Sequence, residues 1–249
     1  MGCSQCNTEL RKDARFCPCC GKATRMGHRE TRAEVQARNR GEDRAGIVLG
    51  LVFAGGLLAV FAPFIIFKEV SEHAWGATLV QSAADLLVFV GAVVLLRPER
   101  QACLAGEQAP TLRGFALAIP VGGVALLLSA LYVTGINALI LDGETAVAAY
   151  ETWPLIFSVV LAAPILEEML CRGAAWQAAL DLGDERLALI LTSVLFAILH
   201  GANGGFVLEF PHRLAAGFLL GWLRWRTGSL YPCILAHFVV NASAVALSN

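Results

Sequence analysis

The hydrophobic pattern divides the chain into a polar N-terminal segment and a long region built of uncharged stretches. A helix needs about 20 mostly apolar residues to cross roughly 30 Å of hydrocarbon. Seven apolar stretches follow residue 45, at 47–67, 75–96, 114–141, 152–180, 187–208, 214–223 and 227–249, and all but the sixth exceed that length. The sixth is the shortest and follows Pro211. We therefore predict an all-α polytopic membrane protein with about seven transmembrane helices.

The composition agrees with a membrane-embedded body. Hydrophobic residues make up 57% of the 249 residues and charged residues only 16%, whereas soluble domains are roughly 25% charged. This excludes a single soluble domain, a disordered chain and a fibrous repeat. The net charge of -1 gives no reason to expect a nucleic-acid partner. We expect membrane lipids to surround residues 46–249, the predicted transmembrane domain.

Lysine and arginine residues predict the orientation of the chain, because cytoplasmic flanks carry an excess of them. Ten of the 19 lie in the first 45 residues. If the N-terminus is cytoplasmic, six later arginines fall on the same side, namely Arg97, Arg100, Arg113, Arg186, Arg224 and Arg226. Only Lys68 and Arg213 then fall on the outer side. We therefore expect a multi-pass cell-membrane protein with a cytoplasmic N-terminal segment and, after seven spans, an outer C-terminus.

Residues 1–22 have the cysteine spacing of a metal site. Two CxxC pairs lie ten residues apart, formed by Cys3, Cys6, Cys17 and Cys20. Four thiolates at this spacing can bind one tetrahedral zinc ion, and metal binding would supply the folding free energy that a segment without an apolar core lacks. The segment resembles the short zinc-ribbon family. Ribbons of this kind bind proteins or nucleic acid or cap a chain end, so we expect a structural zinc, with a protein partner as one use and no catalytic role.

Residues 23–45 form a charged linker between the ribbon and the membrane domain. They contain six arginines and four acidic residues, so they cannot bury a core of their own. Two interpretations stay open. The linker can lie along an anionic inner leaflet, or it can be a solvated spacer with ordinary flanking charge.

Three charged residues interrupt the fourth apolar stretch. A charged side chain at a helix centre costs roughly 2.5 to 3.5 kcal/mol on insertion, so Glu167, Glu168 and Arg172 need a reason to be there. Glu168 and Arg172 are four residues apart, which places them on one helix face as an ion pair. Glu167 lies about 100° round the helix and lacks that partner. The cluster is therefore either functional or a network that packs helices together.

Two later stretches carry polar residues that can join this cluster. Glu167 and His200 are equally far from the segment 183–184, so a helix hairpin that turns there brings them to similar depth. In the last stretch, His237 and Asn241 are four residues apart and share a face. We therefore predict one intramembrane site, with helix-packing contacts as the alternative explanation.

These residues form three short motifs in a fixed order along the chain. The motifs are Glu167-Glu168-x-x-x-Arg172, Phe196-x-x-x-His200 and His237-x-x-x-Asn241. In this order on membrane helices they resemble the motifs of the CPBP family, which comprises Abi, CAAX protease and bacteriocin-processing proteins. The resemblance covers about residues 153–245 and includes the Arg-Thr-Gly-Ser-Leu segment at 226–230.

The resemblance implies an intramembrane glutamic endopeptidase that hydrolyses a peptide bond of a membrane-associated or hydrophobic substrate. Peptide hydrolysis needs a base for water and donors aimed at the developing oxyanion. Glu167 would take the proton from water, and His200 would help to hold that water. His237 and Asn241 would stabilise the oxyanion. No cofactor is expected at this site.

The supporting residues and the rival functions leave alternatives open. Glu168 and Arg172 would shape the site, although Glu168 can instead share the role of base. A carboxylate with two histidines can also bind a metal, which would make a metalloprotease. Against this, the chain has no HExxH motif, and the amide of Asn241 suits an oxyanion better than zinc. The non-enzymatic alternatives are a membrane scaffold, an immunity protein or a transporter with a proton relay.

Overall fold

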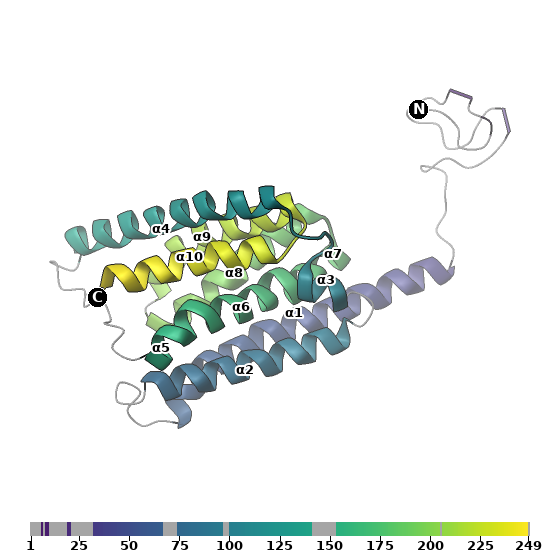
Figure 1. Ribbon diagram of the computed structural model, residues 1–249. Helices are drawn as coiled ribbons and strands as arrows, with labels where there is room; N and C mark the ends of the chain where they lie inside the picture. The colour runs from purple at the N-terminus through teal and green to yellow at the C-terminus, as the bar shows by residue number, and fades with distance from the viewer. Residues whose placement is uncertain are drawn as a thin grey trace. The chain divides into compact units, whose positions relative to one another are not determined.

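The protein is described by a computed structural model, in which every named element is a helix (Figure 1). The residues described are 6, 8, 9, 19, 20, 32–66, 74–96, 100–140, 153–204 and 206–248. The chain forms two compact units, Met1–Gly41 and Glu42–Asn249. Cys3 and Cys17 lie outside the described residues, so the zinc-ribbon stays a prediction. The predicted catalytic and supporting residues all belong to the second unit.

Helices occupy all seven apolar stretches. The long helices are α1 (Arg32–Ile66), α2 (Ala74–Leu95), α4 (Leu112–Ile140), α8 (Glu185–Gly204), α9 (Phe206–Thr227) and α10 (Tyr231–Ser248), with the short α3 (Arg100–Ala105) before α4. The fourth stretch is one continuous helical rod, made of α5 (Trp153–Phe157), η3 (Ser158–Ala162), α6 (Ala163–Glu168), η4 (Met169–Ala175) and α7 (Trp176–Leu182). The all-helical fold class is therefore confirmed.

The number of membrane spans stays a prediction. Among the described residues, two helical segments are long and apolar enough to cross a membrane, Arg40–Phe61 and Leu112–Ile136. Leu79–Leu95 and Tyr231–Leu247 are shorter apolar helices. Large apolar side chains are exposed on the outward faces of the second unit, including Leu87 at 73% and Ile119 at 60%. Such a surface suits lipid as the surrounding solvent.

Several helix boundaries differ from those the hydropathy predicts. The first helix, α1, begins at Arg32, inside the predicted linker 23–45, and not at 47. The sixth helix, α9, begins at Phe206 and continues through Pro211. Glu209 stabilises these turns, because it pairs with His212 at i+3 and Arg213 at i+4. The fifth helix ends at Gly204 rather than at 208, in a stretch whose glycines are poor helix formers.

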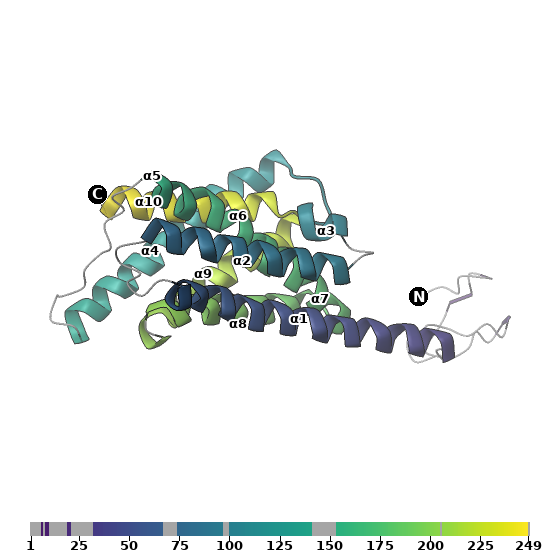
Figure 2. The ribbon, with the colours of Figure 1, turned by 90° about the horizontal axis from the view of Figure 1, so that it is seen from below.

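The helical rod separates two hydrophobic clusters of the second unit. One cluster joins α1, α2 and the rod and includes Val52, Phe89 and Leu170. The other joins α4, α8, α9 and α10 to the rod, and Cys171 belongs to it. Figures 1 and 2 show α1 and α2 on one side of the rod and α4 and α10 on the other. Side chains from both halves therefore meet along the rod.

One end of the bundle is fixed by contacts between two distant segments. Gly106, after α3, pairs as a single β-bridge with Ser229, in the turn between α9 and α10. Gly106 and Gly228 have φ of 95° and 61°, which a residue with a side chain adopts only with strain. Arg224 is 1% exposed, and its Nη1 lies 2.6 Å from Oε2 of Glu107 in the same region. This end therefore holds α9 and α10 in register with the segment before α4.

Candidate active site

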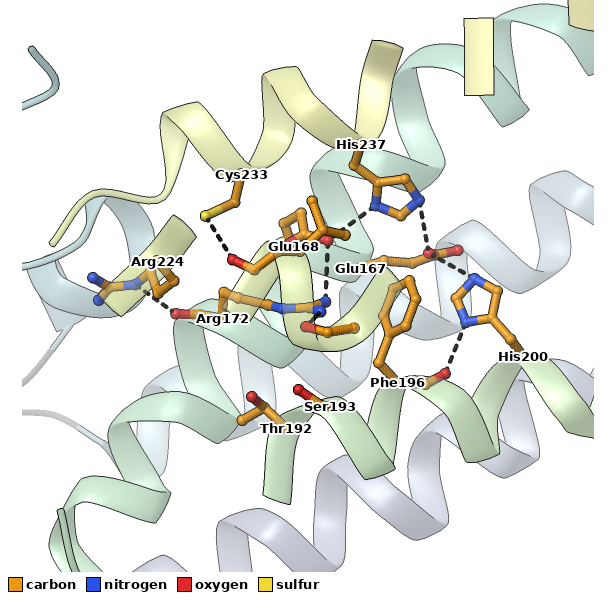
Figure 3. Close-up of polar contacts among 12 residues, drawn as sticks. Glu167, Glu168, Arg172, Thr192, Ser193, Phe196, His200, Arg224, Cys233 and His237 are labelled. Atoms are coloured by element: carbon orange, nitrogen blue, oxygen red, sulfur yellow. Dashed lines mark hydrogen bonds and ion pairs between the residues drawn. The ribbon is translucent and has the colours of Figure 1, made fainter. Parts of the chain in front are cut away.

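Two π-helical segments flank the turn that carries the paired glutamates. Segment η3 precedes α6, and η4 follows directly after Glu168. A π-helical segment widens the helix locally and changes the direction of the side chains beside it, and such segments are frequent at functional sites. In Figure 3, Glu168 points toward Arg172 and His237, whereas Glu167 points toward His200. The two neighbouring carboxylates therefore serve different sets of partners.

Glu168 is the centre of a buried polar network. Its Oε1 accepts a hydrogen bond of 3.1 Å from Arg172 Nη1 and lies 2.9 Å from His237 Nδ1. Glu168 and Arg172 are fully buried, and His237 is 3% exposed. Arg172 also donates from Nη2 to the carbonyl of Gly217 at 2.9 Å. The ion pair that the sequence predicts is therefore present, and it also holds the histidine of the last helix.

Gly217 allows α9 to approach α8 closely enough for this network. A Cβ atom at this position would lie 3.0 Å from the backbone oxygen of Ser193 on α8. The lack of a side chain lets the two helices pack closely and brings the Gly217 carbonyl within reach of Arg172.

Phe196 packs among the charged and polar groups of the site. The centroid of its ring lies 4.5 Å from Cζ of the Arg172 guanidinium and 4.2 Å from the ring centroid of His200. The ring also meets His237 edge-on at 5.6 Å. A cation over an aromatic face is attracted by the ring quadrupole. The Phe196 ring therefore contacts three polar side chains of the site, those of Arg172, His200 and His237.

Glu167 lies where the two histidines meet. Its Oε2 is 3.2 Å from His200 Nε2 and 3.7 Å from His237 Nε2. The helix hairpin turns between Leu182 and Glu185, as the sequence predicts, and the first of these distances confirms that Glu167 and His200 meet.

The Nδ1 atoms of the two histidines, which face away from Glu167, already have hydrogen-bond partners. His200 Nδ1 lies 2.9 Å from the carbonyl oxygen of Phe196, which can only accept, so this nitrogen carries the hydrogen. His237 Nδ1 donates in the same way when Glu168 is ionised beside Arg172. In the neutral imidazoles, both Nε2 atoms then present lone pairs toward Glu167 Oε2. A proton or a small hydrogen-bond donor is needed between these three acceptors.

Asn241 is placed differently from its expected role. Its Nδ2 donates to the carbonyl oxygen of Val159 on η3 at 2.8 Å. His237 Nδ1 is turned toward Glu168, so the donors left for an oxyanion are His237 Nε2, when it is protonated, and the other amide hydrogen of Asn241. The second hydrogen of the Asn241 amide is still available to the cavity that Asn241 lines.

A cavity of about 490 Å³ opens onto Glu167 and His200. Its walls come from α2, α4, the start of the rod, the start of α9 and the end of α10. Seven of its polar lining residues were not singled out by the sequence analysis as site residues: Gln81, Ser82, Asp85, Ser129, Glu209, His212 and Arg213. The sequence does indicate Asp85 as a candidate site residue, because it is the only charged residue in the apolar stretch 75–96.

No metal site is evident in this geometry. In the ranges that the structure describes, no group of three or more His, Cys, Asp or Glu side chains is arranged to hold a metal ion.

One family model matches the chain, and it covers this site. Residues 149–243 match the family described as "Type II CAAX prenyl endopeptidase Rce1-like". No curated protein and no solved structure matches the chain. The matched range contains all three motifs that the sequence analysis identified.

Proposed function

We propose that this protein, which belongs to the CAAX protease (CPBP) family through residues 149–243, is an intramembrane endopeptidase of the glutamic type. The observation that carries the proposal is the convergence of Glu167 Oε2 with two histidine Nε2 atoms at the edge of a large cavity. A water molecule bound beside Glu167 would have a base next to it, with His200 close by. Membership of the family makes CAAX-type proteolysis the activity to test.

Glu167 acts as the general base in this mechanism. It takes one proton from water as the water oxygen attacks the substrate carbonyl, while His200 Nε2, 3.2 Å from Glu167 Oε2, holds this carboxylate in place. Glu167 then gives this proton to the leaving amine nitrogen, and the C–N bond breaks. General acid–base catalysis of this kind is typically worth 10²- to 10⁴-fold in rate.

The oxyanion of the tetrahedral intermediate needs hydrogen-bond donors close to the former carbonyl oxygen. His237 donates from Nε2 when it is protonated, since Glu168 accepts its other hydrogen. Asn241 donates the amide hydrogen that Val159 does not use. Each such donor is worth about 10²- to 10³-fold in kcat.

The cavity suits a hydrophobic peptide segment. Leu126 and Val133 of α4 and Val240 and Leu247 of α10 give it apolar walls. Its polar lining includes Glu167, His200 and Asn241. We propose a membrane-associated or hydrophobic substrate, with prenylation to be tested rather than assumed.

The cavity lies in one half of the bundle. Its lining comes from the start of α2 and α9 and the end of α4 and α10, away from the turns at 183–184 and 228–230. If the arginine-rich end faces the cytoplasm, as we expect, the substrate enters from the outer half. Reporter fusions after residue 45 and at the C-terminus test this orientation, and reports of one compartment from both ends would contradict seven spans.

The activity is tested with purified full-length protein in lipid vesicles. The probe is a mixture of hydrophobic peptides, each present with a farnesylated and an unmodified cysteine, and mass spectrometry measures the products. We expect cleavage by the wild type, incorporation of ¹⁸O from labelled water into the new carboxylate, and loss of at least 100-fold in Glu167→Gln. Arg186→Ala, at an exposed turn far from the cavity, is the matched control and should cleave normally.

Other outcomes would favour the rival functions. Absence of cleavage by wild-type protein that is folded and monodisperse would favour a scaffold, an immunity protein or a proton-relay transporter. Wild-type turnover by Glu167→Gln would remove Glu167 as the base.

A further inference from the structure

We propose that Asp85 is a positioning residue that holds the attacking water against Glu167, together with Gln81. Both residues lie on α2, outside the range that matches the family model. The inference rests on the proposed hydrolytic function and names a further residue for it.

Asp85 is a buried acid without a protein partner among the described residues. Its side chain is on the central part of α2, and the residue is only 9% exposed. No hydrogen bond or ion pair to Asp85 occurs within the part of the chain that the structure describes. A buried polar group without a partner costs about 1 to 3 kcal/mol, and more if it is charged. Such a group is retained only if something else, such as water or substrate, satisfies it.

A second, smaller cavity shows what Asp85 faces. This chamber has a volume of about 50 Å³, which exceeds the roughly 10 to 15 Å³ that a water molecule needs. Its polar lining consists of Gln81, Asp85, Glu167 and His200. The rest of its wall comes from α1, η4 and α8 and is made of Gly56, Val60, Leu170, Cys171, Phe196 and Leu199. A buried water is stable where two to four polar groups surround it, and the chamber supplies four.

The chamber lies directly beside the substrate cavity. The same four polar residues line the large cavity as well. Glu167 therefore stands at the junction, with the small chamber toward α1 and the large cavity toward α4 and α10. A peptide in the large cavity would present its carbonyl from one side, and a water in the chamber would attack from the other.

Each group has a definite role in holding the water. Glu167 accepts the hydrogen that is removed during the attack. Asp85 accepts the second hydrogen of the water, and the Gln81 amide donates to the water oxygen. With both hydrogens directed at carboxylates, a lone pair of the oxygen faces the substrate carbonyl. Fixing the attacking atom in this way lowers the entropy cost of reaching the transition state.

Two other roles for Asp85 make different predictions. If Asp85 bound a cationic group of the substrate, its loss would weaken binding and raise KM. If it only held α2 in the bundle, its loss would lower the thermal unfolding midpoint without changing kcat. A water-positioning role instead lowers kcat and leaves KM nearly unchanged, because Asp85 then acts on the attacking water and not on the bound substrate.

The test compares Asp85→Ala, Asp85→Asn and Leu87→Ala in full-length protein with the peptide mixture described above. Leu87 is on the same helix and 73% exposed, so it controls for changes to α2. We expect Asp85→Ala to lower kcat at least 10-fold with KM within twofold of wild type. Asp85→Asn should recover at least a third of wild-type kcat, because its amide oxygen still accepts from water. Leu87→Ala should match the wild type.

A second variant tests the chamber without changing Asp85. A Cβ at Gly56 would lie 2.8 Å from Cδ2 of Leu199, so Gly56→Ala pushes the Leu199 side chain into the chamber. We expect a kcat at least fivefold lower in the folded protein, again with little change in KM.

The outcomes separate this inference from the proposed function. An active wild type with unchanged kcat in Asp85→Ala would overturn the role of Asp85 alone. So would a raised KM with normal kcat, or equal losses in Asp85→Asn and Asp85→Ala. A wild type that cleaves nothing would overturn the proposed function, and this inference with it.

Discussion

His237 Nδ1 lies 2.9 Å from Oε1 of Glu168, the same oxygen that accepts from Arg172 Nη1 at 3.1 Å. One buried carboxylate oxygen thus links the ion pair of the rod to the histidine of the last helix. His237 in turn faces Glu167 through its other nitrogen. The neutralisation of Glu168 and the orientation of His237 are therefore coupled, and a change at Arg172 affects both.

Arg172→Ala should destabilise the protein as well as inactivate it. The change leaves the Glu168 carboxylate fully buried without its cation, and removal of one partner of a buried pair typically costs about 3 to 5 kcal/mol. We expect a large fall in the thermal unfolding midpoint, measured by tryptophan fluorescence. The exposed Arg186→Ala variant is the control, and an unchanged midpoint in Arg172→Ala would show that the pair contributes nothing to the fold.

His200→Ala and His237→Ala should both abolish peptide hydrolysis but differ in stability. His200 is partly exposed to the cavity, with a side chain 17% exposed, and its loss leaves Phe196 and Glu167 accessible to water. His237 is buried and bonded to Glu168, so its loss removes a hydrogen bond from a buried carboxylate. Thermal unfolding of both variants measures the difference, and a lower midpoint for His200→Ala than for His237→Ala would contradict this.

Asn241→Ala should reduce kcat by about 100-fold if its free amide hydrogen binds the oxyanion. The bond to Val159 holds the amide in position, so KM should change much less. Steady-state kinetics with the cleaved peptide measures both constants. A raised KM with normal kcat would instead assign Asn241 to substrate binding.

The contact between Glu107 and Arg224 should make stability sensitive to acid. Partial burial raises the pKa of Glu107, but the hydrogen bond and charge of Arg224 outweigh it and lower the pKa below its ordinary value of 4.5. A group whose pKa is lower in the folded state stabilises the fold at pH above the unfolded value. This stabilisation is lost as pH falls below 4.5 through the lowered folded pKa.

Glu107→Gln should remove this part of the acid sensitivity. Thermal unfolding between pH 7 and pH 3 should show a shallower decline in the variant than in the wild type, with the two curves converging at the acid end. Parallel curves across the whole range would show that the contact has no linkage to pH.

The N-terminal cysteines should hold about one zinc ion per chain, independently of the membrane site. Metal analysis of purified protein measures the ion, and Cys3→Ser with Cys6→Ser should remove it. This variant should still cleave peptides in the presence of a chelator, because the proposed mechanism activates water by proton transfer to Glu167. Loss of its activity to chelator, with recovery on added zinc, would indicate the metal-dependent form of the protease.

The sequence alone determined the helices and the pairs that depend on local spacing. Hydropathy located all seven helical stretches, and the i, i+4 spacing predicted the pair of Glu168 and Arg172. The meeting of Glu167 and His200 was also predictable, because a short turn at 183–184 fixes the depth of both residues in a hairpin. The order of the motifs indicated the family that the comparison then confirmed.

Only the tertiary structure decided which side chains from distant helices share a cavity. Hydropathy gives the length of a helix but not its rotation about its own axis, so it could not show that Asp85 faces Glu167 across a small chamber. It also could not show that Asn241 bonds to Val159, since this depends on how α10 packs against the rod. Arg224 had the sequence pattern of an exposed flank, yet it is buried because Glu107 reaches it from a segment more than a hundred residues earlier. Contacts of this kind depend on the packing of several helices at once, which no local pattern specifies.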